Sequence, residues 1–198
     1  MPSMIKLADP GIFHTIQGEG HLTGQPMTFV RTATCSVSCP GCDTNYRLAT
    51  KKSVEDIVSE VISVTPPEIR DRWVWLTGGE PTDQNINPLI RGLKKAGFAV
   101  AMATAGINRI TAPVDWLSVS PHGELVQRYG NEIKIVPKLN GFNAEEWIRE
   151  NDDTIDFWLR FLQPLDGDED SQAECLRIQS LFPHWGLTLQ THKIWGFA

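Results

Sequence analysis

The feature that most constrains the fold is an alternation of strand-like and helix-like segments along the chain. β-Rich runs occupy residues 27–32, 73–77, 99–104, 116–120, 132–136, 157–163 and 186–190, and helical patterns occupy residues 53–64, 87–95, 143–149 and 170–182. Strands separated by helical stretches are typical of parallel βαβ units. The 198 residues are too few for a closed eightfold barrel, which needs about 250. We therefore expect an α/β fold with one domain, residues 1–198, built as a partial, open (β/α) barrel with a mainly parallel sheet.

Two of the expected helices carry clear boundary signals. Ser53 is the N-cap candidate of the first helix, with Asp56 three residues further on, and the pair Pro66-Pro67 ends the pattern. Gly97 follows the second helix, where a glycine commonly closes the last turn.

Polar and glycine-rich segments follow the expected strands. In parallel sheets the catalytic groups gather at the carboxyl ends of the strands. We therefore expect six segments to share one rim, namely a cysteine-rich loop after residue 32 and residues 78–81, 104–106, 120–122, 163–164 and 190–193.

Composition and charge exclude some classes of protein. The formal net charge is −6, and Lys51-Lys52 and Lys94-Lys95 are isolated pairs, so we expect no nucleic-acid partner. No window reaches the roughly 18 apolar residues of a membrane span, and residues 1–8 contain no apolar run, so we expect neither a membrane partner nor a signal peptide. The expected location is cytoplasmic, where structural disulfides are disfavoured.

The cysteine spacing Cys35-x3-Cys39-x2-Cys42 is the sharpest chemical signal. Three thiolates can hold a cluster while one iron keeps an open position, which is typical of a catalytic metal centre. A structural zinc site would need a fourth ligand, and neither His14 nor His21 has the ligand spacing. Three free thiols crowded by chance remain the other alternative. The distant Cys175 is interpreted as a small buried hydrophobe.

This cysteine motif, on the loop after the first expected strand, resembles that of the radical S-adenosylmethionine superfamily. The segment Gly78-Gly79-Glu80-Pro81 resembles the superfamily's second motif, which meets the methionine end of the cofactor. Glycines allow close approach of the backbone, and a carboxylate can accept a charge-assisted hydrogen bond from the ammonium group. The resemblance implies a radical-SAM-type barrel, a [4Fe–4S] cluster and S-adenosyl-L-methionine as cofactors.

Five further segments, 13–20, 29–31, 42–44, 163–166 and 190–193, resemble those of the 7-carboxy-7-deazaguanine synthases of queuosine biosynthesis. The resemblance implies a lyase that removes hydrogen from C6 of 6-carboxy-5,6,7,8-tetrahydropterin, contracts the ring, releases ammonia and forms 7-carboxy-7-deazaguanine. It also implies Mg2+, an electron donor such as a flavodoxin or ferredoxin, and a homodimer. A small radical activase of a partner protein and a non-catalytic Fe–S or zinc module are the alternatives.

The same resemblance implies a set of site residues. Cys35, Cys39 and Cys42 would hold the cluster, and Thr44 would be the protein ligand of Mg2+. The residues implied at S-adenosylmethionine are Gly41, Cys42, Asp43, Gly78, Gly79, Glu80, Thr104, Ser120, Pro121, His122, Gln163, Pro164, Leu165 and Asp166. Those implied at the pterin are Ile16, Gln17, Gly18, Glu19, Arg31, Thr77, His192 and Ala198.

Within the substrate set, Arg31 would pair with the pterin carboxylate, Thr77 would donate a hydrogen bond to it, and the terminal carboxylate of Ala198 would meet the aminopyrimidine edge. From the residues alone, Arg31 could be a solvated charge, Thr44 an ordinary turn residue, Gln17-Gly18 a plain turn and His192 a core histidine.

The chain departs from the family pattern at three positions. Ala105 stands where asparagine is usual, and it has no side-chain hydrogen bond to offer. His122 replaces a lysine, which removes a permanent charge, and Gly41 replaces an aromatic residue. These changes indicate a divergent member.

Overall fold

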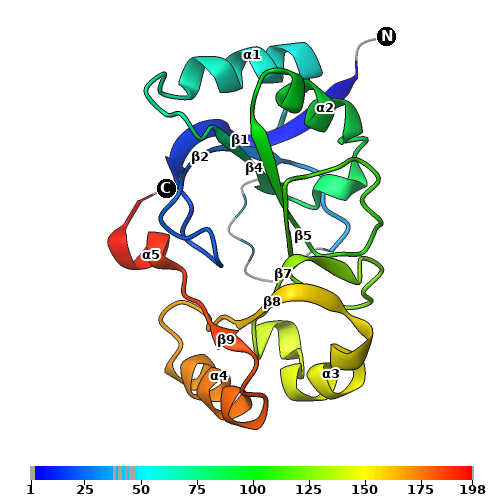
Figure 1. The fold of residues 1–198 in the computed structure, drawn as a ribbon, viewed down its shortest axis with the longest axis vertical. Coiled ribbons are helices and arrows are strands. Elements are labelled where there is room, and N and C mark those ends of the chain that lie inside the picture. The colour runs from blue at the N-terminus through cyan, green and yellow to red at the C-terminus, as the bar shows by residue number, and fades with distance from the viewer. Residues whose placement is uncertain (1–2, 38, 40–41, 43, 45–47, 198) are drawn as a thin grey trace.

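The computed structural model describes residues 3–37, 39, 42, 44 and 48–197. Within these residues, nine strands form one sheet in the order β3-β1-β2-β4-β5-β6-β7-β8-β9 (Figure 1). The strands are β1 (Met4–Ile16), β2 (Pro26–Thr32), β3 (Thr50–Ser53), β4 (Trp73–Gly78), β5 (Ala99–Thr104), β6 (Trp116–Val119), β7 (Tyr129–Ile135), β8 (Asp156–Leu162) and β9 (Gly186–Leu187). The helices are α1 (Val54–Val64), α2 (Asn87–Lys95), α3 (Ala144–Asn151), α4 (Glu169–Leu181) and α5 (Thr191–Trp195), with short 3-10 turns at Pro81–Asp83, Leu139–Gly141 and Asp152–Thr154.

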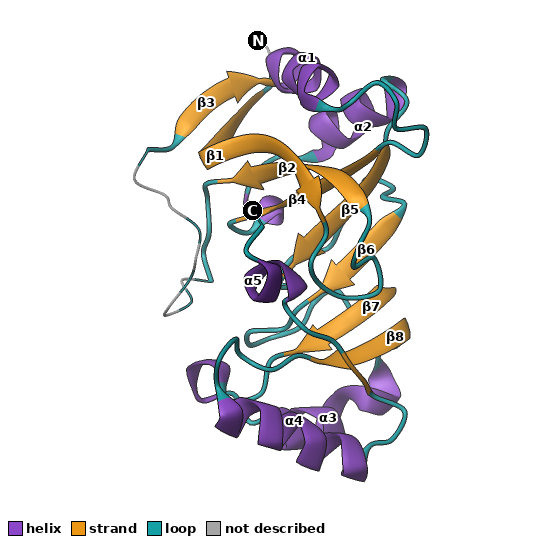
Figure 2. Ribbon diagram, turned by 90° about the vertical axis from the view of Figure 1, so that its left-hand side faces the viewer, coloured by secondary structure: helices purple, strands orange, loops and turns teal. Residues whose placement is uncertain are grey.

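The sheet is mainly parallel and open, as predicted. Strands β2 and β4 to β9 pair in parallel, while β1 pairs antiparallel with β2 and with β3. Because the edge strands β3 and β9 are not neighbours, the sheet does not close. Figure 2 shows α1 and α2 at one end of the molecule, α3 and α4 at the other, and α5 between them.

The boundary signals of the first two helices are confirmed. The hydroxyl of Ser53 caps α1 by accepting a hydrogen bond from the backbone N–H of Asp56. Helix α2 is followed by Gly97, whose φ of 85° lies in the left-handed region that favours glycine. In the described part of the chain no helix is long and apolar enough to cross a lipid bilayer.

Other features of the fold differ from the sequence-based expectation. Strands β1 and β3 and helix α5 were not predicted, so residues 191–193 begin a helix, with Gln190 as its N-cap, instead of ending a strand. The run Asp9-Pro10-Gly11 interrupts the apolar alternation of β1, and the strand absorbs it as a shift in register between Leu7 and Ile12. The described crossovers 105–115 and 120–128 contain no helix, so the βα alternation is incomplete at β5, β6 and β7.

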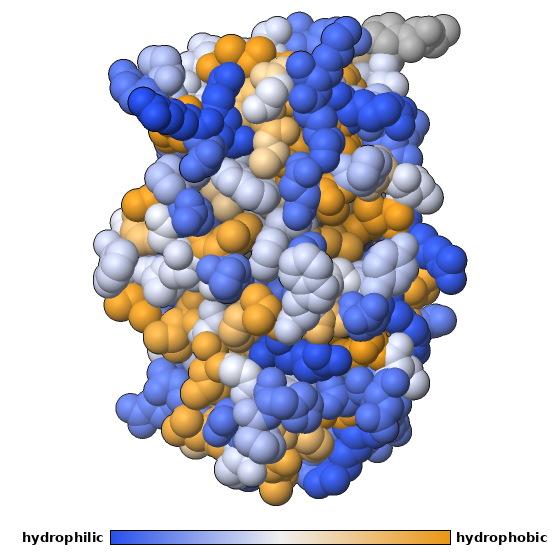
Figure 3. All heavy atoms as spheres, viewed as in Figure 1, coloured by the Kyte–Doolittle hydropathy of each residue, from blue (hydrophilic) through white to orange (hydrophobic). Residues whose placement is uncertain are grey.

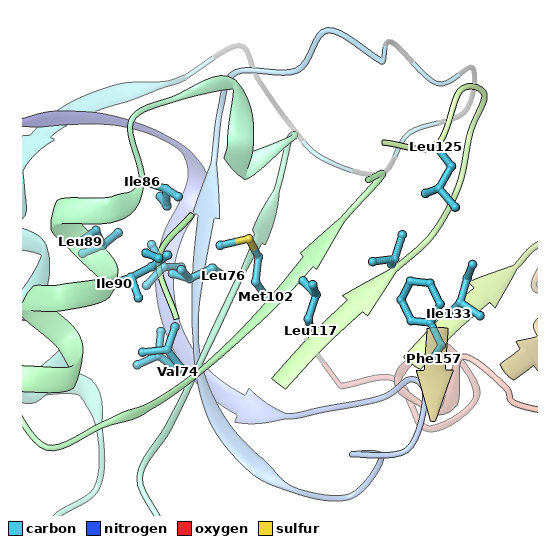
Figure 4. Close-up of a cluster of buried hydrophobic side chains, with 14 of the residues drawn as sticks. Val74, Leu76, Ile86, Leu89, Ile90, Met102, Leu117, Leu125, Ile133 and Phe157 are labelled. Atoms are coloured by element: carbon cyan, nitrogen blue, oxygen red, sulfur yellow. The ribbon is translucent and has the colours of Figure 1, made fainter. Parts of the chain in front are cut away.

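Two apolar layers hold the sheet. The larger one lies between the outer face of the sheet and helices α1 to α4, and Figure 4 shows part of it. The residues labelled there are Val74, Leu76, Ile86, Leu89, Ile90, Met102, Leu117, Leu125, Ile133 and Phe157. A smaller buried cluster of Met27, Trp75 and Ala101 lies on the opposite face of the sheet.

Candidate active site

A cavity of about 530 Å³ lies at the carboxyl ends of the parallel strands. All six predicted rim segments contribute to its lining. The predicted site residues that line it are Ile16, Gln17, Gly18, Glu19, Arg31, Cys35, Cys39, Cys42, Thr44, Thr77, Gly78, Gly79, Glu80, Thr104, Ser120, His122, Gln163, Leu165 and His192. The topology thus brings together residues that are spread over most of the chain.

The three clustered cysteines line this cavity together. Burial raises the pKa of Cys39, and the neighbouring Cys35 and Cys42 raise it further because like charges disfavour a second thiolate. Among the described residues, no three cysteine, histidine or acidic side chains are already arranged to hold a metal ion. Soft thiolates facing one cavity are nevertheless the donor set that iron–sulfur clusters use. In contrast, Cys175 is buried, and burial followed by the charge of Glu174 raises its pKa to about 12.

The second motif, residues 78–81, is hydrogen-bonded to the segment that leads into the cysteine loop. The backbone N–H groups of Gly79 and Glu80 donate to the carbonyls of Thr32 and Thr34, at 2.7 and 2.9 Å. A Cβ atom on Gly79 would lie 2.2 Å from the carbonyl oxygen of Thr34, so no other residue fits there without movement. The close approach that the sequence suggested toward a ligand is made here toward the chain's own backbone.

Glu80 has a fixed carboxylate at the edge of the cavity, with only 2% of the residue exposed. Its Oε1 accepts hydrogen bonds from the hydroxyls of Thr104 and Thr82, at 2.7 and 2.6 Å. Its Oε2 accepts one from the backbone N–H of Ala105, at 2.7 Å. Ala105 therefore binds Glu80 through its main chain, and Thr104 binds the same carboxylate through its hydroxyl.

His122 lies next to the cysteines. Its Nδ1 is 3.7 Å from the Sγ of Cys39. Burial lowers the pKa of His122, and the charge of Glu80 opposes this shift. The neutral imidazole is therefore favoured where a lysine would bring a permanent charge.

The loop after β1 docks onto the C-terminal helix. The carbonyl of Gly18 accepts hydrogen bonds from the N–H and hydroxyl of Thr191, at 2.9 and 3.1 Å. A Cβ on Gly18 would lie 2.3 Å from the Nδ1 of His192, so the absence of a side chain at residue 18 leaves room for the imidazole. Two sequence motifs from the opposite ends of the chain thus form one wall of the cavity.

A buried ion pair supports this wall. The Nζ of Lys134 lies 2.5 Å from Oε2 of Glu19, and the side chain of Lys134 is only 5% exposed. Gln190 donates a hydrogen bond to the other carboxylate oxygen at 2.7 Å. Burial alone would raise the pKa of Glu19, but Lys134 and Gln190 outweigh it and hold the pKa at about 2. Both oxygens of Glu19 therefore already have protein partners.

Arg31 is a cation in the cavity without an acidic partner among the described residues. It pairs in register with Thr77 on the neighbouring strand. Its guanidinium lies 4.9 Å from the ring centroid of Phe13, which itself stacks on Phe29. This arrangement is suited to hold a planar anionic ligand.

Comparisons with known proteins agree with these observations. No family model matches the chain. The 7-carboxy-7-deazaguanine synthase of Burkholderia multivorans is 32% identical over 92% of this chain and 94% of that protein. The synthase of Haemophilus influenzae is 33% identical over 93% of this chain and 91% of its own length.

The chain belongs to the 7-carboxy-7-deazaguanine synthase family. A crystal structure of QueE from Escherichia coli has the same fold, with a TM-score of 0.72 and 26% identity over 94% of both chains. Membership of this radical S-adenosylmethionine family implies a [4Fe–4S] cluster and S-adenosylmethionine as cofactors.

Some site residues predicted from the synthase family do not line the cavity. Pro121, Pro164 and Asp166 are among the described residues but outside its lining. Gly41, Asp43 and Ala198 lie outside the described residues.

Sequence reasoning also missed part of the synthase cavity. Phe13, Phe29 and Trp75 line it. Phe29 and Trp75 precede Arg31 and Thr77 by two residues on their strands, so they share the inner face. Side chains alternate between the two faces of a strand, and this period of two residues could have identified Phe29 and Trp75 as neighbours of Arg31 and Thr77.

Proposed function

We propose that the chain is a radical S-adenosylmethionine lyase that converts 6-carboxy-5,6,7,8-tetrahydropterin to 7-carboxy-7-deazaguanine, with loss of ammonia. One observation carries the substrate assignment: the cavity lined by the cluster cysteines also holds Arg31, a cation with no described acidic partner. A planar guanidinium is the group best suited to bind the pterin carboxylate. The names of the related synthases support the same reaction.

Each residue has a distinct task in this proposal. Cys35, Cys39 and Cys42 hold the cluster, and Glu80 accepts hydrogen bonds from the ammonium group of S-adenosylmethionine. When bound and reduced, these cofactors supply the 5′-deoxyadenosyl radical that removes hydrogen from the substrate. Arg31 orients the pterin, with Phe13 beneath its guanidinium.

The surroundings of the cavity serve the same reaction. Trp75 and Phe29 form an apolar floor that keeps water from reactive groups. We propose the same roles for the other residues that the family resemblance assigns to the cofactor and the substrate.

The test of the function is anaerobic incubation with a reductant, S-adenosylmethionine and the pterin, followed by mass spectrometry. We expect 7-carboxy-7-deazaguanine to form in proportion to pterin consumed. Formation of deoxyadenosine with unchanged pterin would contradict the substrate assignment while leaving the radical chemistry in place.

Replacing Arg31 by alanine is expected to weaken pterin binding and leave S-adenosylmethionine binding unchanged. A charge-assisted hydrogen bond contributes about 1.5–3 kcal/mol, which is roughly 10- to 150-fold in affinity. The two dissociation constants are measured separately by titration. Arg72→Ala is the control, because its guanidinium also lies over a phenylalanine ring, 4.1 Å from the centroid of Phe98, but outside the cavity. Equal losses for both ligands would show that Arg31 does not read the carboxylate.

We further propose that Mg2+ assists the reaction with Thr44 as its protein ligand. The hydroxyl of Thr44 donates to the carbonyl of Gly78 at 3.2 Å, so its oxygen can still accept a cation. Thr44→Ala is expected to lose most of the stimulation of turnover by Mg2+. Thr23→Ala is the control, since that hydroxyl donates to the Gly20 carbonyl outside the cavity. A Thr44 variant that responds to Mg2+ like the parent would rule out this ligand.

The cellular setting completes the proposal. A flavodoxin or ferredoxin in the cytoplasm reduces the cluster, and the enzyme is a homodimer. Trp158 and Trp195 are 76% and 73% exposed, which suits an interface between subunits. Figure 3 shows hydrophobic side chains interspersed with hydrophilic ones over the face in view. Sedimentation of the purified protein measures the oligomeric state.

A further inference from the structure

The turn after Glu80 contacts the cysteine loop through a side chain as well as through the backbone. Asp83 lies in the 3-10 turn Pro81–Asp83. Its Oδ2 accepts a hydrogen bond from the backbone N–H of Ser36 at 2.6 Å, and its Oδ1 accepts one from the Ser36 hydroxyl at 3.0 Å. Ser36 directly follows the cluster residue Cys35.

The turn itself is well anchored. The side chain of Gln84 exchanges two hydrogen bonds with the backbone of Lys6, at 2.7 and 3.0 Å. The carbonyl of Lys6 also accepts a bond from the N–H of Ala33, just before the cysteine loop. Asp83 therefore extends from a turn that is tied both to β1 and to the start of the loop.

These contacts fix the chain on both sides of Cys35. On one side, the N–H of Glu80 donates to the carbonyl of Thr34 at 2.9 Å. On the other side, the carboxylate of Asp83 holds both donors of Ser36. The same short turn thus follows Glu80 directly and holds the backbone next to Cys35. It therefore positions a residue proposed to bind the cofactor and a residue proposed to bind the cluster relative to each other.

We propose that Asp83 is a positioning residue that holds Cys35 in place for the cluster by binding Ser36. The inference rests on the proposed function, because it concerns the cluster that this function requires. Hydrogen bonds to an ionised carboxylate are stronger than neutral ones, and two of them from one residue restrict its orientation. Loss of the carboxylate lets Cys35 move away from its iron more often, so the cluster dissociates faster.

The first test measures iron release from the reconstituted, oxidised protein to a chelator without oxygen. The variants are Asp83→Ala, Asp83→Asn, Ser36→Ala and the double variant of Asp83→Ala with Ser36→Ala. We expect Asp83→Ala to release iron about three- to tenfold faster, as loss of charge-assisted bonds at an exposed site predicts. Ser36→Ala should have a smaller effect and should add nothing once Asp83 is absent.

The control is Asp168→Ala. Asp168 also accepts a serine N–H, that of Ser171 at 2.8 Å, but it caps α4 away from the cavity. It should leave the rate of iron release unchanged. Equal release from the Asp83 variants and the parent, or an additive effect of Ser36→Ala, would overturn the inference.

A second readout does not depend on the cluster. In the cluster-free protein, the Ser36 amide should exchange its hydrogen more slowly in the parent than in Asp83→Ala, which removes the acceptor. Equal exchange rates would also overturn the inference. A parent protein that binds no iron, while Ser36 remains protected by Asp83, would instead count against the proposed function alone.

Discussion

Cys39→Ala is expected to yield a protein that binds no stable iron–sulfur cluster and forms no 5′-deoxyadenosine from S-adenosylmethionine. Cys39 is the central member of three cysteines that line one cavity. Because one iron of the cluster must stay open for the cofactor, loss of a thiolate leaves two protein ligands for a centre that needs three. The measurements are iron and sulfide content after anaerobic reconstitution, the visible absorbance, and deoxyadenosine by chromatography.

Cys175→Ala is the matched control for this experiment. Cys175 is only 2% exposed in the larger core cluster, and burial followed by the charge of Glu174 raises its pKa to about 12, so it is not a thiolate at neutral pH. This variant is expected to bind the cluster like the parent. A Cys39→Ala protein that forms deoxyadenosine at the parental rate would refute the cluster assignment.

Glu19→Gln is expected to lower the free energy of unfolding at pH 7 by about 3–5 kcal/mol, the usual cost of breaking a buried ion pair on one side. The reason is Lys134, whose side chain is 5% exposed and whose charge would lose its counterion. The measurement is denaturant unfolding of the cluster-free protein. Glu60→Gln is the control, because the side chains of its ion pair with Lys52 are 34% and 36% exposed, and ion pairs near the surface contribute about 0–1 kcal/mol. Equal losses in the two variants would contradict the prediction.

The ion pair also predicts how stability depends on pH. The pKa of Glu19 is held at about 2 in the folded protein, below its usual 4.5. A lowered folded-state pKa contributes stability that is fully present above pH 4.5 and is lost as pH falls through about 2. The stability difference between the parent and Glu19→Gln should therefore narrow between pH 5 and pH 2. A constant difference in stability over this range would show that Lys134 does not lower the pKa of Glu19.

Local signals made part of this structure predictable. The bounds of α2 and β5 were predicted to the residue, because a glycine ends the helix and a short apolar run defines the strand. The cysteine spacing is likewise contained within eight residues and needs no knowledge of the fold. Because the cysteines follow a predicted strand, they could be placed at the carboxyl end of the sheet together with the second motif.

Long-range contacts explain what could not be predicted. Lys134 lies 115 residues from Glu19 in sequence, and nothing around either residue marks the other as its partner. Helix α5 has five residues, too short for a periodic pattern, and its first residue is held by Gly18. The two sides of the cavity wall thus depend on a tertiary contact that neither segment encodes alone.

The contact between Gly18 and Thr191 also has a consequence for the order of events during protein synthesis. A ribosome delivers the cysteine loop early, whereas Thr191 emerges 173 residues after Gly18. The contact cannot form before Thr191 has left the ribosome, so this wall forms late. Until then the nascent chain presents its thiols on an incomplete half-barrel. Changes near residue 191 therefore act on the chamber for the substrate, although they lie far along the chain from the cysteines.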